Sequence, residues 1–228
     1  MSLKGAIFDL DGTLIDSEPI YFDASEILIK KYGNGKKFDW DTKVKTLGSP
    51  ELVTAQIIVE TFEINLSPEE YLEKRNAITP EYFKKCSFME GAKEITEKFK
   101  KKLKFKTAIA TSSAQINFDY KTFNKKQWLK ETIDIVVLGD DKRIKNGKPA
   151  PAIFILAAHD LGLEPKDCIM FEDSISGINA AISSGAKIVV GIPDPHLRKK
   201  AEEIKYDEKV TKLILLDKIK DFDWSIIN

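Results

Sequence analysis

Short apolar runs alternate with helical patterns through most of this chain. A strand is expected within residues 3–9, where a mainly apolar run ends at Asp9. From residue 91 onward, the pattern predicts strands at 105–110, 133–138, 167–171, 186–190 and 213–216, separated by helices at 91–101, 114–130, 150–161, 175–184 and 195–203. Apolar, β-branched strands between helices are typical of a parallel sheet that is covered on both faces.

Residues 16–87 differ, because they show helical spacing and no strand pattern. Helices are expected at 16–31, 39–46, 51–62 and 68–85, and the last two begin at Ser-Pro pairs, which favour a helix start. The chain is therefore predicted to be an α/β protein with a Rossmann-like doubly wound parallel sheet core, residues 1–15 and 88–228. A small all-helical domain, residues 16–87, is inserted after the first strand.

Charge and composition exclude several classes of partner. The 228 residues carry 36 basic and 36 acidic side chains, which gives no field directed at nucleic acid or a membrane. We find no signal-peptide pattern and no apolar run near the roughly 20 residues that span a bilayer. Cys86 and Cys168 lack metal-ligand spacing, so a reducing, cytoplasmic location is expected. Cys168 is expected to be buried and Cys86 partly exposed, and His159 is expected to pack within its apolar helix.

Two carboxylates, Asp9 and Asp11, follow the first strand and precede Gly12. At the carboxyl end of a strand, both would lie near the ligand-binding edge of the sheet. Their repulsion must be relieved by a cation or a shared proton, which points to a hard metal ion beside a reactive carboxylate. A hydrated surface turn explains the same residues equally well, because Asp and Gly are common in turns.

Chemically useful side chains also follow the other predicted strands. Thr111-Ser112-Ser113 comes after strand 105–110, Lys148 precedes a helix start, and Glu172-Asp173 comes after strand 167–171. Each alone is usually a helix cap or a surface loop. Together they suit phosphoryl transfer, in which a carboxylate nucleophile forms an aspartyl-phosphate, Mg²⁺ and lysine neutralise the phosphoryl oxygens, and a second carboxylate moves the proton.

Four segments resemble, in order, the four motifs of the haloacid dehalogenase-like hydrolases. They are Asp-Leu-Asp-Gly-Thr-Leu-Ile-Asp from Asp9, Ala-Thr-Ser-Ser from Ala110, Gly-Lys-Pro-Ala-Pro from Gly147 and Phe-Glu-Asp-Ser-Ile-Ser-Gly from Phe171. The likeness implies that Asp9 is the nucleophile and Asp11 the general acid/base. It also implies phosphate binding by Thr111, Ser112, Ser113 and Lys148, and a Mg²⁺ site formed by Asp9, the Asp11 carbonyl, Asp173 and Glu172. The helical insert resembles the mobile cap of that family.

A narrower likeness, at residues 38–45, 55–58, 110–122 and 137–141, is to the eukaryotic pseudouridine-5′-phosphatase branch. It implies a phosphomonoesterase for a small phosphorylated metabolite, with pseudouridine 5′-monophosphate as the first choice of substrate. Glu18 and Gly48, in the insert, are expected to contact the leaving group, and the protein is expected to be a monomer. The alternatives are a glycerol or deoxysugar phosphate phosphatase, a β-phosphoglucomutase-like mutase, and a binding module without catalysis.

Overall fold

The computed structural model describes residues 3–33, 35–46 and 51–227. The chain divides into two compact units, one formed by Met1–Asp16 together with Ser87–Asn228 and the other by Ser17–Cys86. Within the described residues, no helix combines the length and the apolar character needed to cross a membrane.

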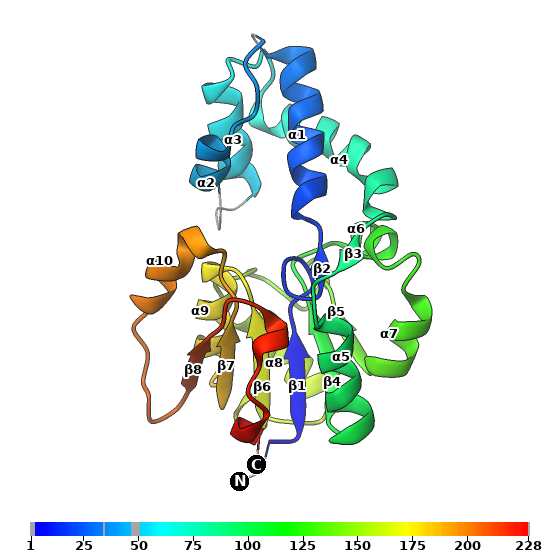
Figure 1. The fold of residues 1–228 in the computed structure, drawn as a ribbon, viewed down its shortest axis with the longest axis vertical. Coiled ribbons are helices and arrows are strands. Elements are labelled where there is room, and N and C mark those ends of the chain that lie inside the picture. The colour runs from blue at the N-terminus through cyan, green and yellow to red at the C-terminus, as the bar shows by residue number, and fades with distance from the viewer. Residues whose placement is uncertain (1–2, 34, 47–50, 228) are drawn as a thin grey trace. The chain divides into compact units, whose positions relative to one another are not determined.

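A parallel sheet forms the centre of the first unit (Figure 1). Among the described residues it has six strands, in the spatial order β5-β4-β1-β6-β7-β8. Their bounds are β1 Gly5–Phe8, β4 Lys106–Ala110, β5 Ile135–Val137, β6 Cys168–Glu172, β7 Ile188–Gly191 and β8 Lys212–Leu215. Strand β1 pairs with β4 on one side and with β6 on the other, so the direction in which strands are added reverses here. Such a reversal is where an open α/β sheet binds its ligand.

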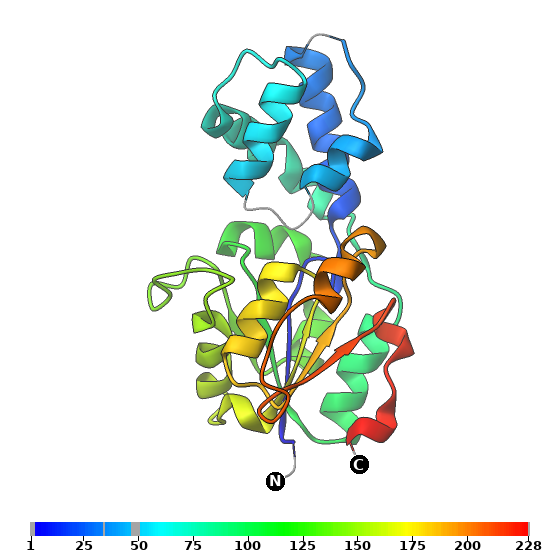
Figure 2. The same ribbon diagram turned by 90° about the vertical axis from the view of Figure 1, so that its left-hand side faces the viewer.

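Alternate residues of the central strands face opposite sides of the sheet, as the period of two requires. Ile7 and Met170 lie in the core beneath helices α8 (Ala152–Asp160) and α9 (Ile175–Ser183). Phe8 and Phe171 stack on the other face, with ring centroids 4.8 Å apart. There they meet Phe99, which follows α5 (Ala92–Glu97) in the π-helical turn Lys98–Lys102. Figure 2 shows helices on both sides of the strands, which confirms the predicted α/β layering.

The remaining elements of this unit differ from the prediction at two places. The single helix expected at 114–130 is instead two, α6 (Gln115–Lys121) and α7 (Lys126–Thr132). The break falls at Thr122-Phe123-Asn124, where all three residues have modest helix propensity. A two-residue strand, β2 (Ile15–Asp16), also pairs antiparallel with β3 (Ser87–Phe88), where no strand pattern was seen. Helix α10 (Arg198–Glu202) follows a 3₁₀ turn at Pro195–Leu197.

In the described residues of the second unit, the regular secondary structure is helical. Its helices are α1 Glu18–Tyr32, α2 Trp40–Thr46, α3 Glu51–Thr61 and α4 Pro68–Phe83. At the start of α4, Ser67 and Glu70 form a reciprocal capping box, which satisfies backbone N–H groups that the first turn leaves unpaired. Leu28, Phe38, Ile58 and Tyr71 lie in its apolar core.

Two expectations about single side chains are wrong. The His159 side chain is 84% exposed rather than packed, because it projects from the outer face of α8 while Ala157 and Ala158 face the sheet. Cys86 was expected to be partly exposed but is buried, with 4% of its surface accessible. Cys168 is buried in β6, as expected.

Candidate active site

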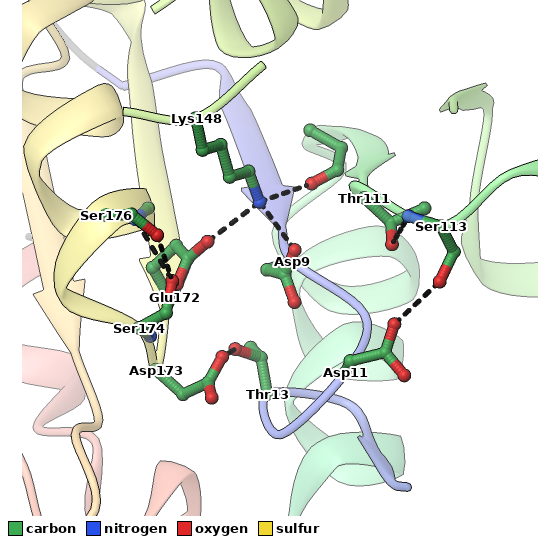
Figure 3. Close-up of polar contacts among 12 residues, drawn as sticks. Asp9, Asp11, Thr13, Thr111, Ser113, Lys148, Glu172, Asp173, Ser174 and Ser176 are labelled. Carbon is green, nitrogen blue, oxygen red and sulfur yellow. Dashed lines mark hydrogen bonds and ion pairs between the residues drawn. The ribbon is translucent and has the colours of Figure 1, made fainter. Parts of the chain in front are cut away.

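Lys148 joins two acidic residues beyond the carboxyl ends of the central strands (Figure 3). Its ammonium donates to Asp9 Oδ1 at 2.5 Å, to Glu172 Oε1 at 2.7 Å and to the carbonyl of Ala110 at 3.0 Å. Asp9 follows β1, Ala110 ends β4 and Glu172 ends β6. The lysine therefore donates hydrogen bonds to residues at the carboxyl ends of three neighbouring strands. Its side chain is 4% exposed, and that of Glu172 is 1% exposed. One positive charge is therefore enclosed with two negative ones.

The electrostatics of this cluster follow from its burial. Burial raises the pKa of Asp9 to about 7, Lys148 opposes the rise, and the negative charges of Glu172 and Asp11 add to it. Burial alone would lower the pKa of Lys148, but the charges and hydrogen bonds of Asp9 and Glu172 outweigh it and raise that pKa. The lysine stays charged, and the cluster keeps an excess of negative charge when both carboxyls are ionised.

Glu172 is held by the beginning of α9. Its Oε2 accepts hydrogen bonds from the backbone N–H of Ser174 at 2.7 Å and from the Ser174 hydroxyl at 3.0 Å. Gly177, in the first turn of the same helix, leaves the space that the carboxylate fills. A Cβ at this position would stand 1.6 Å from Glu172 Oε1. Glycine is thus required here for close approach rather than for an unusual backbone angle.

Asp11 has a separate set of partners. One carboxylate oxygen lies 2.6 Å from the ammonium of Lys121, and the other accepts a hydrogen bond from the Ser113 hydroxyl at 2.8 Å. Lys121 also donates to that hydroxyl at 2.8 Å. The lysine is the last residue of α6 and its side chain is fully buried, whereas 27% of the Asp11 side chain is exposed. Lys121 lies within the 110–122 segment of the narrower likeness, but it was not among the predicted site residues.

The loop after β1 also meets the loop after β6. Asp173 Oδ1 accepts a hydrogen bond from the Thr13 hydroxyl at 3.2 Å. Gly12 belongs to the loop after β1 and has φ +75°, and a Cβ there would be 2.3 Å from Asp173 Oδ2. Both the left-handed backbone and the space beside the carboxylate therefore need glycine. Thr13 was not among the predicted site residues.

The hydroxyl residues after β4 divide into three environments. Thr111 is buried, and its Oγ1 accepts from the backbone N–H of Ser113 at 3.1 Å. Ser112 is exposed, whereas the Ser113 hydroxyl faces Asp11. In the other unit, Glu18 is exposed and forms an ion pair with Lys43. Gly48, the second residue predicted to contact the leaving group, lies outside the described residues.

The oxygen-rich edge suits a hard cation in its chemistry. Carboxylates and carbonyls are the ligands that Mg²⁺ prefers, and one lysine does not balance the negative charge of the cluster. The space at Gly12 admits the Asp173 carboxylate beside the loop that carries Asp9 and Asp11. Across the described part of the chain, no group of three or more His, Cys, Asp or Glu side chains is arranged to hold a metal ion. In this structure the carboxylates are paired with lysine ammonium groups and hydroxyls instead.

Comparison with known proteins gives the family to which the chain belongs. Residues 6–190 match the family model of haloacid dehalogenase-like hydrolases, so the chain belongs to that family. It is 35% identical over 193 residues to a probable pseudouridine-5′-phosphatase of Drosophila melanogaster, a match covering 84% of this chain and 82% of the relative. It is 34% identical over 218 residues to (DL)-glycerol-3-phosphatase 2 of Arabidopsis thaliana, covering 93% and 88% of the two chains.

Among solved structures, a haloacid dehalogenase hydrolase of family IA, variant 3, from Entamoeba histolytica superposes with a TM-score of 0.76. It is 26% identical, and the match covers 100% of this chain and 97% of that one. Because the chain belongs to this family and these relatives are named phosphatases, we conclude that it is a phosphatase of the haloacid dehalogenase-like family.

Proposed function

We propose that this protein hydrolyses a small phosphate monoester through an aspartyl-phosphate formed on Asp9. The observation that supports the proposal best is the buried Asp9 carboxylate held by Lys148 at the point where the strand order reverses. Enclosure strips water from the carboxylate, and the lysine fixes one of its oxygens, which leaves the other for nucleophilic attack.

The reaction then has two steps. In the first, Asp9 Oδ2 attacks phosphorus, the bond to the ester oxygen breaks, and Asp11 supplies the proton that the leaving alkoxide needs. In the second, water attacks phosphorus and its proton passes to Asp11. The bond from phosphorus to Asp9 breaks, which releases inorganic phosphate and restores the Asp9 carboxylate. Lys148, the Thr111 hydroxyl and the Ser112 amide stabilise the phosphoryl oxygens.

In this proposal, Mg²⁺ is the cofactor, held by Asp9, the Asp11 carbonyl and Asp173, with Glu172 close by. When bound, it supplies positive charge to the phosphoryl group and offsets the excess negative charge of the cluster. The second unit, Ser17–Cys86, is proposed to act as the cap, and Glu18 and Gly48 to contact the leaving group. We also propose that the enzyme is a cytoplasmic monomer.

Pseudouridine 5′-monophosphate is the proposed substrate. The probable pseudouridine-5′-phosphatase from Drosophila supports this choice. The glycerol-3-phosphatase of Arabidopsis, matched over more of the chain at nearly the same identity, makes glycerol 3-phosphate the alternative that has independent support.

A panel assay separates these substrates. Phosphate release with Mg²⁺ is measured for pseudouridine and uridine 5′-monophosphates, glycerol 3-phosphate, a deoxysugar phosphate and β-glucose 1-phosphate. We expect the highest kcat/KM with pseudouridine 5′-monophosphate. A preference for glycerol 3-phosphate would replace the substrate and keep the chemistry. Isomerised sugar phosphate without phosphate release would contradict the hydrolase proposal.

A further inference from the structure

The buried lysine of α6 lies outside the four family motifs. Lys121 is fully buried, and removing an ammonium from water costs several kcal/mol unless its hydrogen bonds and charge are compensated. Here the compensation comes from Asp11 at 2.6 Å and the Ser113 hydroxyl at 2.8 Å. A lysine that served only solubility would not be placed at this depth.

The three side chains form a closed triangle. The Ser113 hydroxyl accepts from Lys121 and donates to Asp11 Oδ2, while the ammonium lies against Asp11 Oδ1. Both carboxylate oxygens are thus fixed by groups from the segment that follows β4. A carboxylate bound at both oxygens keeps one rotamer, whereas an exposed aspartate ordinarily samples several. The two lysines of the site also differ in what they hold, because Lys148 contacts Asp9 and Lys121 contacts Asp11.

We propose that Lys121 and Ser113 are positioning residues that hold Asp11 in the orientation needed to accept the proton of the hydrolytic water. This inference rests on the proposed function, because the water is the one that attacks the aspartyl-phosphate on Asp9. The water oxygen bonds to phosphorus, its proton moves to an Asp11 oxygen, and the bond from phosphorus to the Asp9 oxygen breaks. A general base typically contributes about 10²–10⁴-fold to the rate, and most of that depends on its geometry.

The aryl ester p-nitrophenyl phosphate isolates this step. Its phenolate leaves without a proton, so the first step needs little help from Asp11, whereas the second step needs the base. In Lys121→Met the side chain keeps its length and loses its charge. We expect kcat to fall by about 10–100-fold. KM should fall in the same proportion, so that kcat/KM stays within about 3-fold of the wild-type value.

Rapid mixing should then show a burst of nitrophenolate before the slow steady state, as the aspartyl-phosphate accumulates. Ser113→Ala removes the hydroxyl but keeps the lysine, and a smaller fall in kcat of the same kind is expected. Lys106→Met is the matched control, because Lys106 donates to the Leu161 carbonyl at the amino end of β4. This variant removes the same charge from the same structural unit, and it should show wild-type kcat and no burst.

Several results would overturn the inference. If kcat and kcat/KM fall together without a burst in Lys121→Met, the lysine supports the fold or the first step instead. Unchanged kinetics of Lys121→Met would also contradict the positioning role of Lys121. A crystal structure of Lys121→Met with Asp11 still at hydrogen-bond distance from Ser113 would show that the lysine does not set the orientation. Failure of the proposed function is distinguishable, because the wild-type enzyme would then release no phosphate from any ester.

Discussion

Asp9 and Asp11 leave the same strand two residues apart, yet they belong to different surroundings. Asp9 shares one lysine with Glu172 in a cluster of buried charged side chains, where burial raises the pKa of Asp9 to about 7. Asp11 contacts a different lysine, Lys121, accepts a hydrogen bond from the Ser113 hydroxyl, and remains more exposed. The difference matches the two tasks proposed for them. A nucleophile gains from loss of solvent, while a proton carrier needs access to water and a fixed direction.

The largest expected effect comes from Asp9→Asn. The amide keeps the shape but cannot attack phosphorus, so turnover should fall by about 10⁴-fold or more. Stability should not fall, because the substitution removes a carboxylate that burial disfavours and leaves Lys148 paired with Glu172. Phosphate release and thermal unfolding measure the two effects. The exposed aspartate Asp221 gives the control Asp221→Asn, and turnover of Asp9→Asn within tenfold of this control would contradict the nucleophile assignment.

Lys148→Met should lower both activity and stability. Loss of the donor to the phosphoryl group is expected to cost about 10²–10³-fold in kcat. Two buried carboxylates would face each other without their cation, and breaking a buried pair costs about 3–5 kcal/mol in the free energy of unfolding. Urea denaturation of this variant beside exposed Lys145→Met measures the second effect. A Lys148→Met protein as stable as the control would show that the cluster is not a closed ion-pair network.

Gly177→Ala tests how Glu172 is held beside Lys148 and Asp9, without changing any of these three residues. The new Cβ would overlap Glu172 Oε1, so the carboxylate must move away from Lys148. We expect a loss of about 1–3 kcal/mol in stability, as for other overpacked sites, and a reduced kcat. Gly147→Ala is the control, since a Cβ there meets no atom within 4 Å. Equal behaviour of the two variants would contradict the close packing of Glu172 against α9.

The smallest expected effect concerns the thiol of Cys168, at the amino end of β6. Burial raises the pKa of Cys168 from 9.0 to about 12, with Asp167 adding to the rise. At pH 8 the native thiol stays protonated, and iodoacetamide should label Cys168 only after unfolding. Because the native state disfavours the thiolate, stability should decline as pH rises above 9. Peptide mapping that finds native Cys168 labelled as fast as the denatured residue would contradict its burial.

The pattern of apolar and polar residues was sufficient to predict the parallel sheet and the order of strands and helices along the chain. Apolar strands such as 168–171 are recognisable because each is short, β-branched or aromatic, and bounded by helices. The break between α6 and α7 was not predictable, because Lys121 and Trp128 are both buried and nothing in the local pattern shows that they serve separate helices. A two-residue pair such as β2 with β3 is shorter than any periodicity can reveal.

The site was predictable to the extent that its residues follow strands directly. Asp9, Lys148 and Glu172 were expected together, and the structure brings their side chains into contact. Lys121 was not predicted as a site residue, because its partner Asp11 lies in a distant part of the chain and the sequence of α6 does not show that its last residue is buried. A buried charge can be identified only when the group that compensates it is known.

Chemical trapping tests the central claim most directly. The enzyme is mixed with Mg²⁺ and a substrate from the panel, quenched during turnover, and treated with borohydride, which reduces an aspartyl-phosphate to homoserine. Peptide mass spectrometry should then find homoserine at position 9 in the wild-type protein and none in Asp9→Asn. Phosphate release with no modification at Asp9, or with homoserine at position 11 instead, would contradict the mechanism.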